Sequence, residues 1–167
     1  SNVSTIIVTH DPFEAMFISN QINIMNTSGN IVQSGTPEQL YNNPKNSYVT
    51  EFFGETNKFK GVVNNSLVHT PVGKIKVPDN LENKNVEIHI RPKGIKLIEQ
   101  PTPVNGIKGT VMASKLIGSF SFIHLSVLDD NNEIVHVHSH MPPGFNPKQS
   151  SAVEIEIDQS ETYIFQT

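Results

Sequence analysis

The spacing of hydrophobic residues changes near residue 56 of the chain. Up to about residue 55, short apolar runs alternate with segments in which apolar residues recur at helical spacing. From residue 57 onward, short apolar segments are separated by turns containing Gly, Pro and Asn. Because strands repeat every two residues and helices about every 3.6, this pattern predicts a mixed region followed by an all-β region.

The first region is expected to open with a strand over residues 3–8, followed at once by a helix. The strand is predicted because this run is β-branched and nearly continuous, as in a strand buried on both faces of a parallel sheet. The helix should have Asp11 as N-cap, Pro12 at its first position and Glu14 at its third, the layout of a capping box. The apolar residues within 13–17 are expected to pack on the sheet.

A hairpin and two more helices are predicted to complete the first region. The hairpin consists of strands over residues 22–25 and 31–33, joined by a turn at a Ser-Gly-Asn sequence. The second helix begins at residues 36–39, where Thr36 is the expected N-cap. The third runs over residues 46–53 and ends at a glycine.

The second region is predicted to form a small barrel or sandwich. Several short strands separated by turns are typical of these architectures. An Asp-Asp-Asn-Asn sequence at 129–132 predicts a hairpin. Residues 100–105, which include two prolines, are interpreted as a linker between two groups of strands. The predicted strand segments are 60–64, 74–77, 86–91, 107–114, 121–128, 133–138, 153–157 and 162–165.

Composition and charge narrow the classes of function. The chain has 167 residues, a formal net charge of −4 and 17% charged residues, so it offers no large cationic face for nucleic acid. It contains no cysteine, which excludes disulfides and thiolate metal sites. No run approaches the roughly 20 apolar residues that span a bilayer, and no signal peptide is recognised at the start. These features favour a soluble intracellular protein.

Four motifs, in order along the chain, carry a resemblance to a known family. They are Thr-His-Asp at 9–11, Gln-Ser-Gly-Thr-Pro at 33–37, Phe-Phe-Gly-Glu-Thr-Asn at 52–57 and Ile-Arg-Pro at 90–92. Together they resemble the C-terminal part of an ATP-binding-cassette (ABC) importer ATPase, from its switch-histidine loop through a TOBE-type regulatory domain. One departure is Asn-Gln at 20–21, where an Asp-Arg pair is usual in the family.

The resemblance implies a fold class and two domains. The chain should be mainly β, with the tail of an α/β nucleotide-binding domain over residues 1–56. An oligonucleotide-fold-like (OB-like) β-barrel regulatory domain should follow over residues 57–167. His10 matches the switch histidine, which contacts the γ-phosphate of ATP in such enzymes. ATP and magnesium are therefore expected in the intact parent protein; alternatively, His10 only satisfies a strand-to-helix turn.

The fragment is expected to be catalytically inert by itself. Its only Gly-Lys pair, at 73–74, lacks the first glycine and the final Ser or Thr of a phosphate-binding loop. The acidic strand that would hold magnesium and the Leu-Ser-Gly-Gly signature are also absent from the sequence. No cofactor is therefore expected in the fragment.

The function implied by the resemblance is regulation and dimerisation of an ATP-binding subunit that energises solute import, with ferric iron as the expected solute. A polyamine or other small-solute importer is the alternative, as is a stand-alone β-barrel module that binds a small solute or metal. Expected partners are a second copy, membrane permease subunits and a solute-binding protein, with no nucleic acid. The expected location is cytoplasmic, peripheral at the inner face of the bacterial plasma membrane.

One cluster of residues does not come from the family resemblance. His136, His138 and His140 occupy alternate positions, so a strand would place their imidazoles on one face, about 6–7 Å apart along the strand. Neutral imidazoles are ligands for zinc, copper or nickel, and these three residues are the candidate metal ligands. An exposed polar strand face explains the same pattern and is the plainer interpretation. Three further histidines are expected to be structural: His69, His89 and His124.

Overall fold

The computed structural model describes residues 4–99 and 106–167, and the predicted linker at 100–105 lies outside these ranges. The chain divides into two compact units, Ser1–Gly54 (unit 1) and Glu55–Thr167 (unit 2), which are described separately below. The division falls within the Phe-Phe-Gly-Glu-Thr-Asn motif. None of the helices in the described ranges has the length and apolar character needed to span a membrane.

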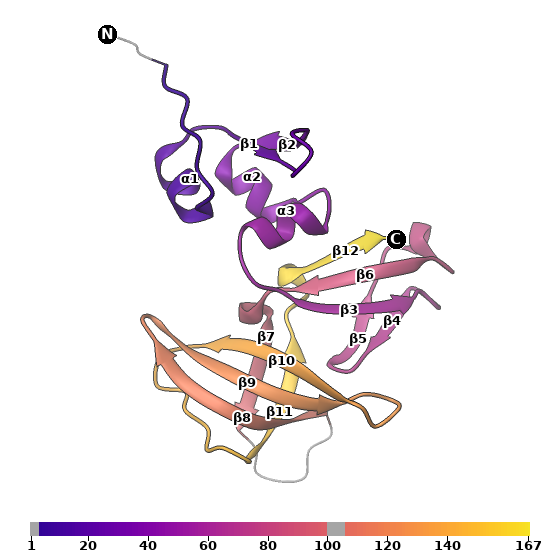
Figure 1. Cartoon of the computed structure of the whole chain (residues 1–167). Helices are drawn as coiled ribbons and strands as arrows, with labels where there is room; N and C mark the ends of the chain where they lie inside the picture. Colours follow the sequence, from indigo (N-terminus) through magenta and orange to yellow (C-terminus); the bar gives the residue numbers. More distant parts are fainter. Residues whose placement is uncertain (1–3, 100–105) are drawn as a thin grey trace. The chain divides into compact units, whose positions relative to one another are not determined.

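Unit 1 contains short helices and one hairpin (Figure 1). The antiparallel strands β1 and β2 form the predicted hairpin, with β2 two residues longer than expected. A small core of Ala15, Ile22, Ile24, Leu40, Val49 and Phe53 lies between the helices and the hairpin. The elements are α1 (Pro12–Ile18), β1 (Ile22–Met25), β2 (Ile31–Gly35), α2 (Pro37–Asn42) and α3 (Ser47–Phe52).

The predicted helix starts are confirmed, with one difference at α1. The Asp11 side chain accepts hydrogen bonds from the backbone N–H groups of Phe13 and Glu14, so it is the N-cap. Glu14, however, accepts a hydrogen bond from the Thr9 hydroxyl instead of the Asp11 backbone, so the capping box is half formed. At α2 both halves of the capping box between Thr36 and its third helical residue are present.

The prediction of a strand over residues 3–8 is wrong for its described part. Residues 4–8 form no strand, and the side chains of Ile6 and Val8 are 93% and 95% exposed. The apolar face of α1 is exposed as well, at 73% for Phe13 and 91% for Phe17. A strand needs a hydrogen-bonded neighbour, and the described residues supply none to this segment.

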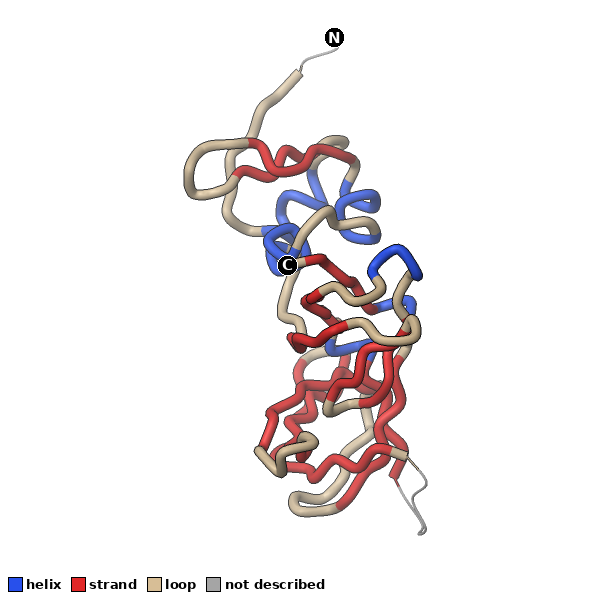
Figure 2. Tube along the Cα trace, turned by 90° about the vertical axis from the view of Figure 1, so that its right-hand side faces the viewer, coloured by secondary structure: helices blue, strands red, loops and turns tan. Residues whose placement is uncertain are grey.

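Among its described residues, unit 2 is all β apart from three short 3₁₀ turns, and strand dominates it in Figure 2. Each strand segment predicted after residue 57 overlaps an observed strand, which confirms the mainly β fold class. Two strands, β4 and β7, were not predicted. The strands are β3 (Asn57–Val62), β4 (Leu67–Thr70), β5 (Gly73–Lys76), β6 (Asn85–Ile90), β7 (Ile95–Glu99), β8 (Ile107–Ile117), β9 (Phe120–Leu128), β10 (Ile134–Met141), β11 (Ala152–Ile157) and β12 (Thr162–Gln166).

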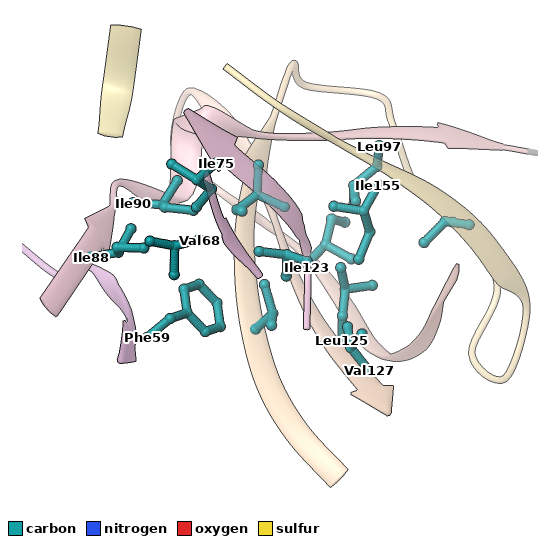
Figure 3. Packing of buried hydrophobic residues seen from close by; sticks show 14 of the residues in the cluster. Phe59, Val68, Ile75, Ile88, Ile90, Leu97, Ile123, Leu125, Val127 and Ile155 are labelled. Carbon is teal, nitrogen blue, oxygen red and sulfur yellow. The ribbon is translucent and has the colours of Figure 1, made fainter. Parts of the chain in front are cut away.

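The strands of unit 2 form three antiparallel sheets around one core. Their orders are β10-β9-β8-β11-β7, β12-β6-β3 and β4-β5. Apolar residues of all three sheets belong to one continuous cluster: Figure 3 shows Phe59 and Ile88 in the same cluster as Ile123 and Leu125. The two larger sheets therefore stabilise each other, and unit 2 has a single hydrophobic core.

Candidate functional site

His10 lies in the exposed segment that leads into α1. The hydrogen bonds of Asp11 and Thr9 fix the backbone on its C-terminal side: Asp11 caps the helix, and the Asp11 N–H donates to the Thr9 hydroxyl at 3.1 Å. The imidazole is thus carried by an ordered helix start and is open to solvent. An exposed imidazole in this position can donate to or accept from a group supplied from outside the described residues.

The histidines of β10 lie on the outer face of the five-stranded sheet. Burial alternates along β10, with Val137 and Ser139 buried and the intervening histidines more exposed. The side chains of His136, His138 and His140 therefore share one face, as the alternate spacing predicts. The role of these three residues as metal ligands stays a prediction.

His124, which was expected to be structural, belongs to the same face. The register of β9 and β10 places it directly opposite His138, with ring centroids 4.9 Å apart. Its Nε2 atom lies 3.0 Å from Nδ1 of His136. The cross-strand pairing thus brings His124 of β9 together with His136 and His138 of β10.

Glu55 is a functional candidate that the sequence analysis missed. Its carboxylate accepts a hydrogen bond from Nδ1 of His138. The position of Glu55 follows from Asn57, whose side chain accepts from the His138 backbone N–H at 2.7 Å and donates to the His138 carbonyl at 2.9 Å. This two-bond contact holds the start of β3 against β10. Together His124, His136, His138 and Glu55 form what we call the histidine cluster.

His140 has a different environment from the other two β10 histidines. Its ring stacks on Phe120, with centroids 4.0 Å apart and planes at 27°. The Phe122 ring lies beside it, at 5.6 Å. These aromatic contacts give the imidazole partly apolar surroundings on the strand face. Of the three predicted metal ligands, the structure brings His136 and His138 toward His124 and sets His140 apart.

Electrostatics keep part of this face uncharged. Burial lowers the pKa of His124, and the neighbouring His138 and His136 lower it further, while Glu55 raises it. Burial also lowers the pKa of His140. Both side chains are therefore neutral at pH 7, and a neutral imidazole keeps a ring nitrogen lone pair free to accept a proton or bind a metal.

His89, by contrast, has a structural environment, in agreement with the prediction. It is fully buried, with Nε2 2.6 Å from the Glu87 carboxylate and Nδ1 2.9 Å from the Thr56 hydroxyl. The hydrogen bond from His89 lowers the pKa of Glu87. Both ring nitrogens are occupied by partners within unit 2.

Two of the sequence motifs have clear structural roles. In the 33–37 motif, the buried Gln33 side chain donates to the Asn43 carbonyl at 3.0 Å and accepts from the Lys45 N–H at 2.9 Å, which fixes the segment after α2. In the 90–92 motif, the buried Arg91 guanidinium lies over the Tyr163 ring, 5.2 Å from its centroid. The Gln33 contacts position the backbone after α2, and the Arg91 contact packs its side chain against β12.

Comparison with known proteins identifies a class of relatives. No family model matches the chain. Its homologues are ATP-binding subunits of ABC importers, and they align with most of its residues.

Among these relatives are proteins named for different solutes. The chain is 36% identical over 141 residues to the sulfate/thiosulfate import ATP-binding protein CysA 2 of Shewanella oneidensis, covering 81% of this chain and 38% of the relative. It is 33% identical over 168 residues to the spermidine/putrescine import ATP-binding protein PotA of Acetivibrio thermocellus, covering 97% and 44%. For PotA of Clostridioides difficile the identity is 34% over 142 residues, covering 82% and 39%. The chain therefore spans about two fifths of the length of the curated relatives it matches.

Proposed function

We propose that this chain is the C-terminal region of an ATP-binding subunit that energises solute import. The alignment over 97% of the chain with an import ATP-binding protein carries the proposal. Residues 1–56 would be the tail of the nucleotide-binding domain, and residues 57–167 an OB-like, TOBE-type regulatory domain. The single core and antiparallel sheets of unit 2 are compatible with such a domain.

The exposed apolar surface of unit 1 supports this proposal. Ile6, Val8 and Phe17 are each more than 90% exposed, and Phe13 is 73% exposed, on a unit with only a small core of its own. Several large apolar side chains exposed to this extent within a dozen residues are typical of a segment that packs against other protein. In the proposed parent, these side chains pack against the rest of the nucleotide-binding domain, and residues 4–8 gain the strand partners that the described residues do not supply.

His10 would act in that parent as the switch histidine. A neutral imidazole can donate a hydrogen bond to a γ-phosphate oxygen and help to hold the attacking water in line. The exposed position of His10 at an ordered helix start supports the assignment. ATP and its magnesium ion would be bound by other parts of the parent, since the phosphate-binding loop is not in this sequence.

The proposed partners follow from the class of relatives. They are a second copy of the subunit, membrane permease subunits and a solute-binding protein, at the inner face of the plasma membrane. No nucleic-acid partner is proposed, in keeping with the net charge of −4. Ferric iron stays a prediction for the solute. The polyamine alternative is supported to the same degree, since relatives named for spermidine/putrescine import are among the matches.

The decisive experiment uses the native-length protein that contains this sequence. Substituting His10→Ala should lower steady-state ATP hydrolysis by about 10²–10³-fold, as the loss of one hydrogen-bond donor to a developing charge does. ATP binding, measured by equilibrium titration, should change little.

His69→Ala is the matched control, because His69 is an exposed histidine of unit 2 and is remote in sequence from the switch loop. It should leave hydrolysis unchanged. Equal activity of the His10→Ala variant and the unmodified protein would disprove the switch role, and a native polypeptide of only 18.5 kDa would favour the stand-alone module.

A further inference from the structure

We propose that His124, His136 and His138 bind a zinc ion on the outer face of β9 and β10, with Glu55 orienting His138. The proposal does not depend on the importer assignment, because all four residues lie within unit 2. It differs from the site predicted by the alternating sequence, since His124 replaces His140 as the third ligand.

The His124–His136 pair already has nearly the separation of two ligands on one metal. Its Nε2 and Nδ1 atoms are 3.0 Å apart. Zinc–nitrogen bonds of about 2.0–2.1 Å at a tetrahedral angle place two ligand nitrogens roughly 3.4 Å apart. An opening of a few tenths of an ångström, within the range of side-chain rotation, would admit the ion between them.

The ring positions place His138 beside the His124–His136 pair as the third candidate ligand. Imidazoles bound to one tetrahedral zinc have centroids roughly 5 Å apart. The His124 ring lies 4.9 Å from the His136 ring and 4.9 Å from the His138 ring. Because Nδ1 of His138 contacts Glu55, its Nε2 is the ring nitrogen left for the metal. No nitrogen of His138 lies within 4.8 Å of both nitrogens of the pair, so binding requires the His138 side chain to turn toward the ion and the half-exposed Glu55 side chain to follow it.

Glu55 supplies the support that zinc-bound histidines usually have. Metal-binding imidazoles commonly donate their other ring N–H to a carboxylate, which fixes the tautomer and raises the basicity of the ligand nitrogen. The Glu55 carboxylate makes this contact with His138. Asn57 holds the segment in place through its two hydrogen bonds to the His138 backbone.

Ligand type and access also suit metal binding. The ligand set consists of imidazole nitrogen atoms, which zinc accepts readily. His136 is exposed, and the side chains of His138 and Glu55 are 30% and 50% exposed, so an ion can enter from solvent. The printed ring contacts of His140 are with Phe120 and Phe122 and not with another imidazole, so His140 is left out of the proposed ligand set.

The test is zinc titration of the metal-free, untagged 167-residue chain, followed by competition with a chromogenic chelator. We expect one equivalent of zinc to bind in the micromolar range. His136→Ala should weaken binding by at least about tenfold, and Glu55→Gln by about tenfold. His140→Ala is the matched control on the same strand face and should stay within about twofold of the unmodified chain.

A second measurement keeps the proposal testable if a variant folds poorly. In the unmodified chain, zinc should shift the NMR signals of the His124, His136 and His138 ring protons and leave those of His69 unchanged. Absence of saturable binding up to millimolar zinc would overturn the proposal. So would a loss of affinity in His140→Ala equal to that in His136→Ala.

Discussion

At the scale of single residues, Asn57 connects the two larger sheets of unit 2. It lies at the start of β3, and its side chain bonds both backbone groups of His138 on β10. It also donates to the Ile90 carbonyl at 3.3 Å. Because Asn57 is buried, its removal would take a hydrogen-bond partner from the backbone N–H and carbonyl of His138 and from the Ile90 carbonyl.

Substituting Asn57→Ala should therefore destabilise unit 2 by about 1–3 kcal/mol, the cost of leaving buried hydrogen-bonding groups unsatisfied. Urea unfolding followed by circular dichroism measures the change in the free energy of unfolding. Asn80→Ala, at an exposed asparagine of the same unit, is the control and should change it by less than about 0.5 kcal/mol. A similar effect of both substitutions would contradict the connecting role of Asn57.

The histidine cluster shows which residues sequence reasoning can find. The shared face of His136 and His138 follows from the period of a strand, which is a local property. Glu55 is 83 positions away from His138, and no local pattern relates two such residues. The stacking of His140 on Phe120 is likewise a tertiary contact, so a local reading could not separate His140 from the other two.

At the scale of elements, the β9–β10 turn decides which residues join the site. His124 faces His138 because five residues, 129–133, separate the paired positions Leu128 and Ile134. A turn one residue shorter would shift the register and place His124 opposite a buried position. The Asp-Asn sequence predicts that a hairpin exists, but it leaves the length of the turn open.

Most strands were predictable because each buries alternate apolar residues. The two strands that were not predicted, β4 and β7, were missed for different reasons. β4 has four residues and only one fully buried side chain, Val68, so its pattern is too short to recognise. β7, by contrast, does carry an alternating apolar pattern, in Ile95 and Leu97, so the sequence contains a signal for this strand.

The capping box of α2 gives a prediction at the same scale. Thr36→Ala removes the acceptor for the Gln39 N–H, which costs about 1 kcal/mol of local stability. Amide hydrogen exchange in α2 should accelerate about fivefold, since opening of the helix becomes more favourable by that amount. Thr36→Ser retains the hydroxyl and should restore near-normal exchange; equal rates in both variants would show that the cap does not stabilise the helix.

At the scale of the whole molecule, the histidines make unit 2 sensitive to acid. The pKa values of His124 and His140 are lowered from their ordinary value of 6.5. Below pH 6.5 the unfolded chain therefore binds more protons than the folded one, and acidification favours unfolding. Three charged or titratable groups face these two histidines. Glu55 raises the pKa of both, and His138 lowers the pKa of both. His136 lowers the pKa of His124.

We expect the Tm of unit 2, measured by calorimetry, to fall as the pH is lowered from about 7.5 to about 5.5. The pKa values of Glu87 and Asp158 are lowered from their ordinary values of 4.5 and 3.8. These two carboxylates therefore affect the stability of unit 2 only at a more acidic pH. The double variant His124→Gln/His140→Gln should show a flatter profile above pH 5.5. A Tm that stays constant or rises on acidification would contradict this prediction.

The order of strands in the five-stranded sheet has a consequence for biosynthesis. β11 pairs on one edge with β8 and on the other with β7, so it joins two strands made well before it. During translation β7 and β8 leave the ribosome while the strand that connects them does not yet exist. Their pairing edges and inward side chains are unprotected until residue 157 has emerged. Unit 2 therefore cannot complete the five-stranded sheet until β11 has been synthesised, and chaperones that shield nascent strands would act on it during this interval.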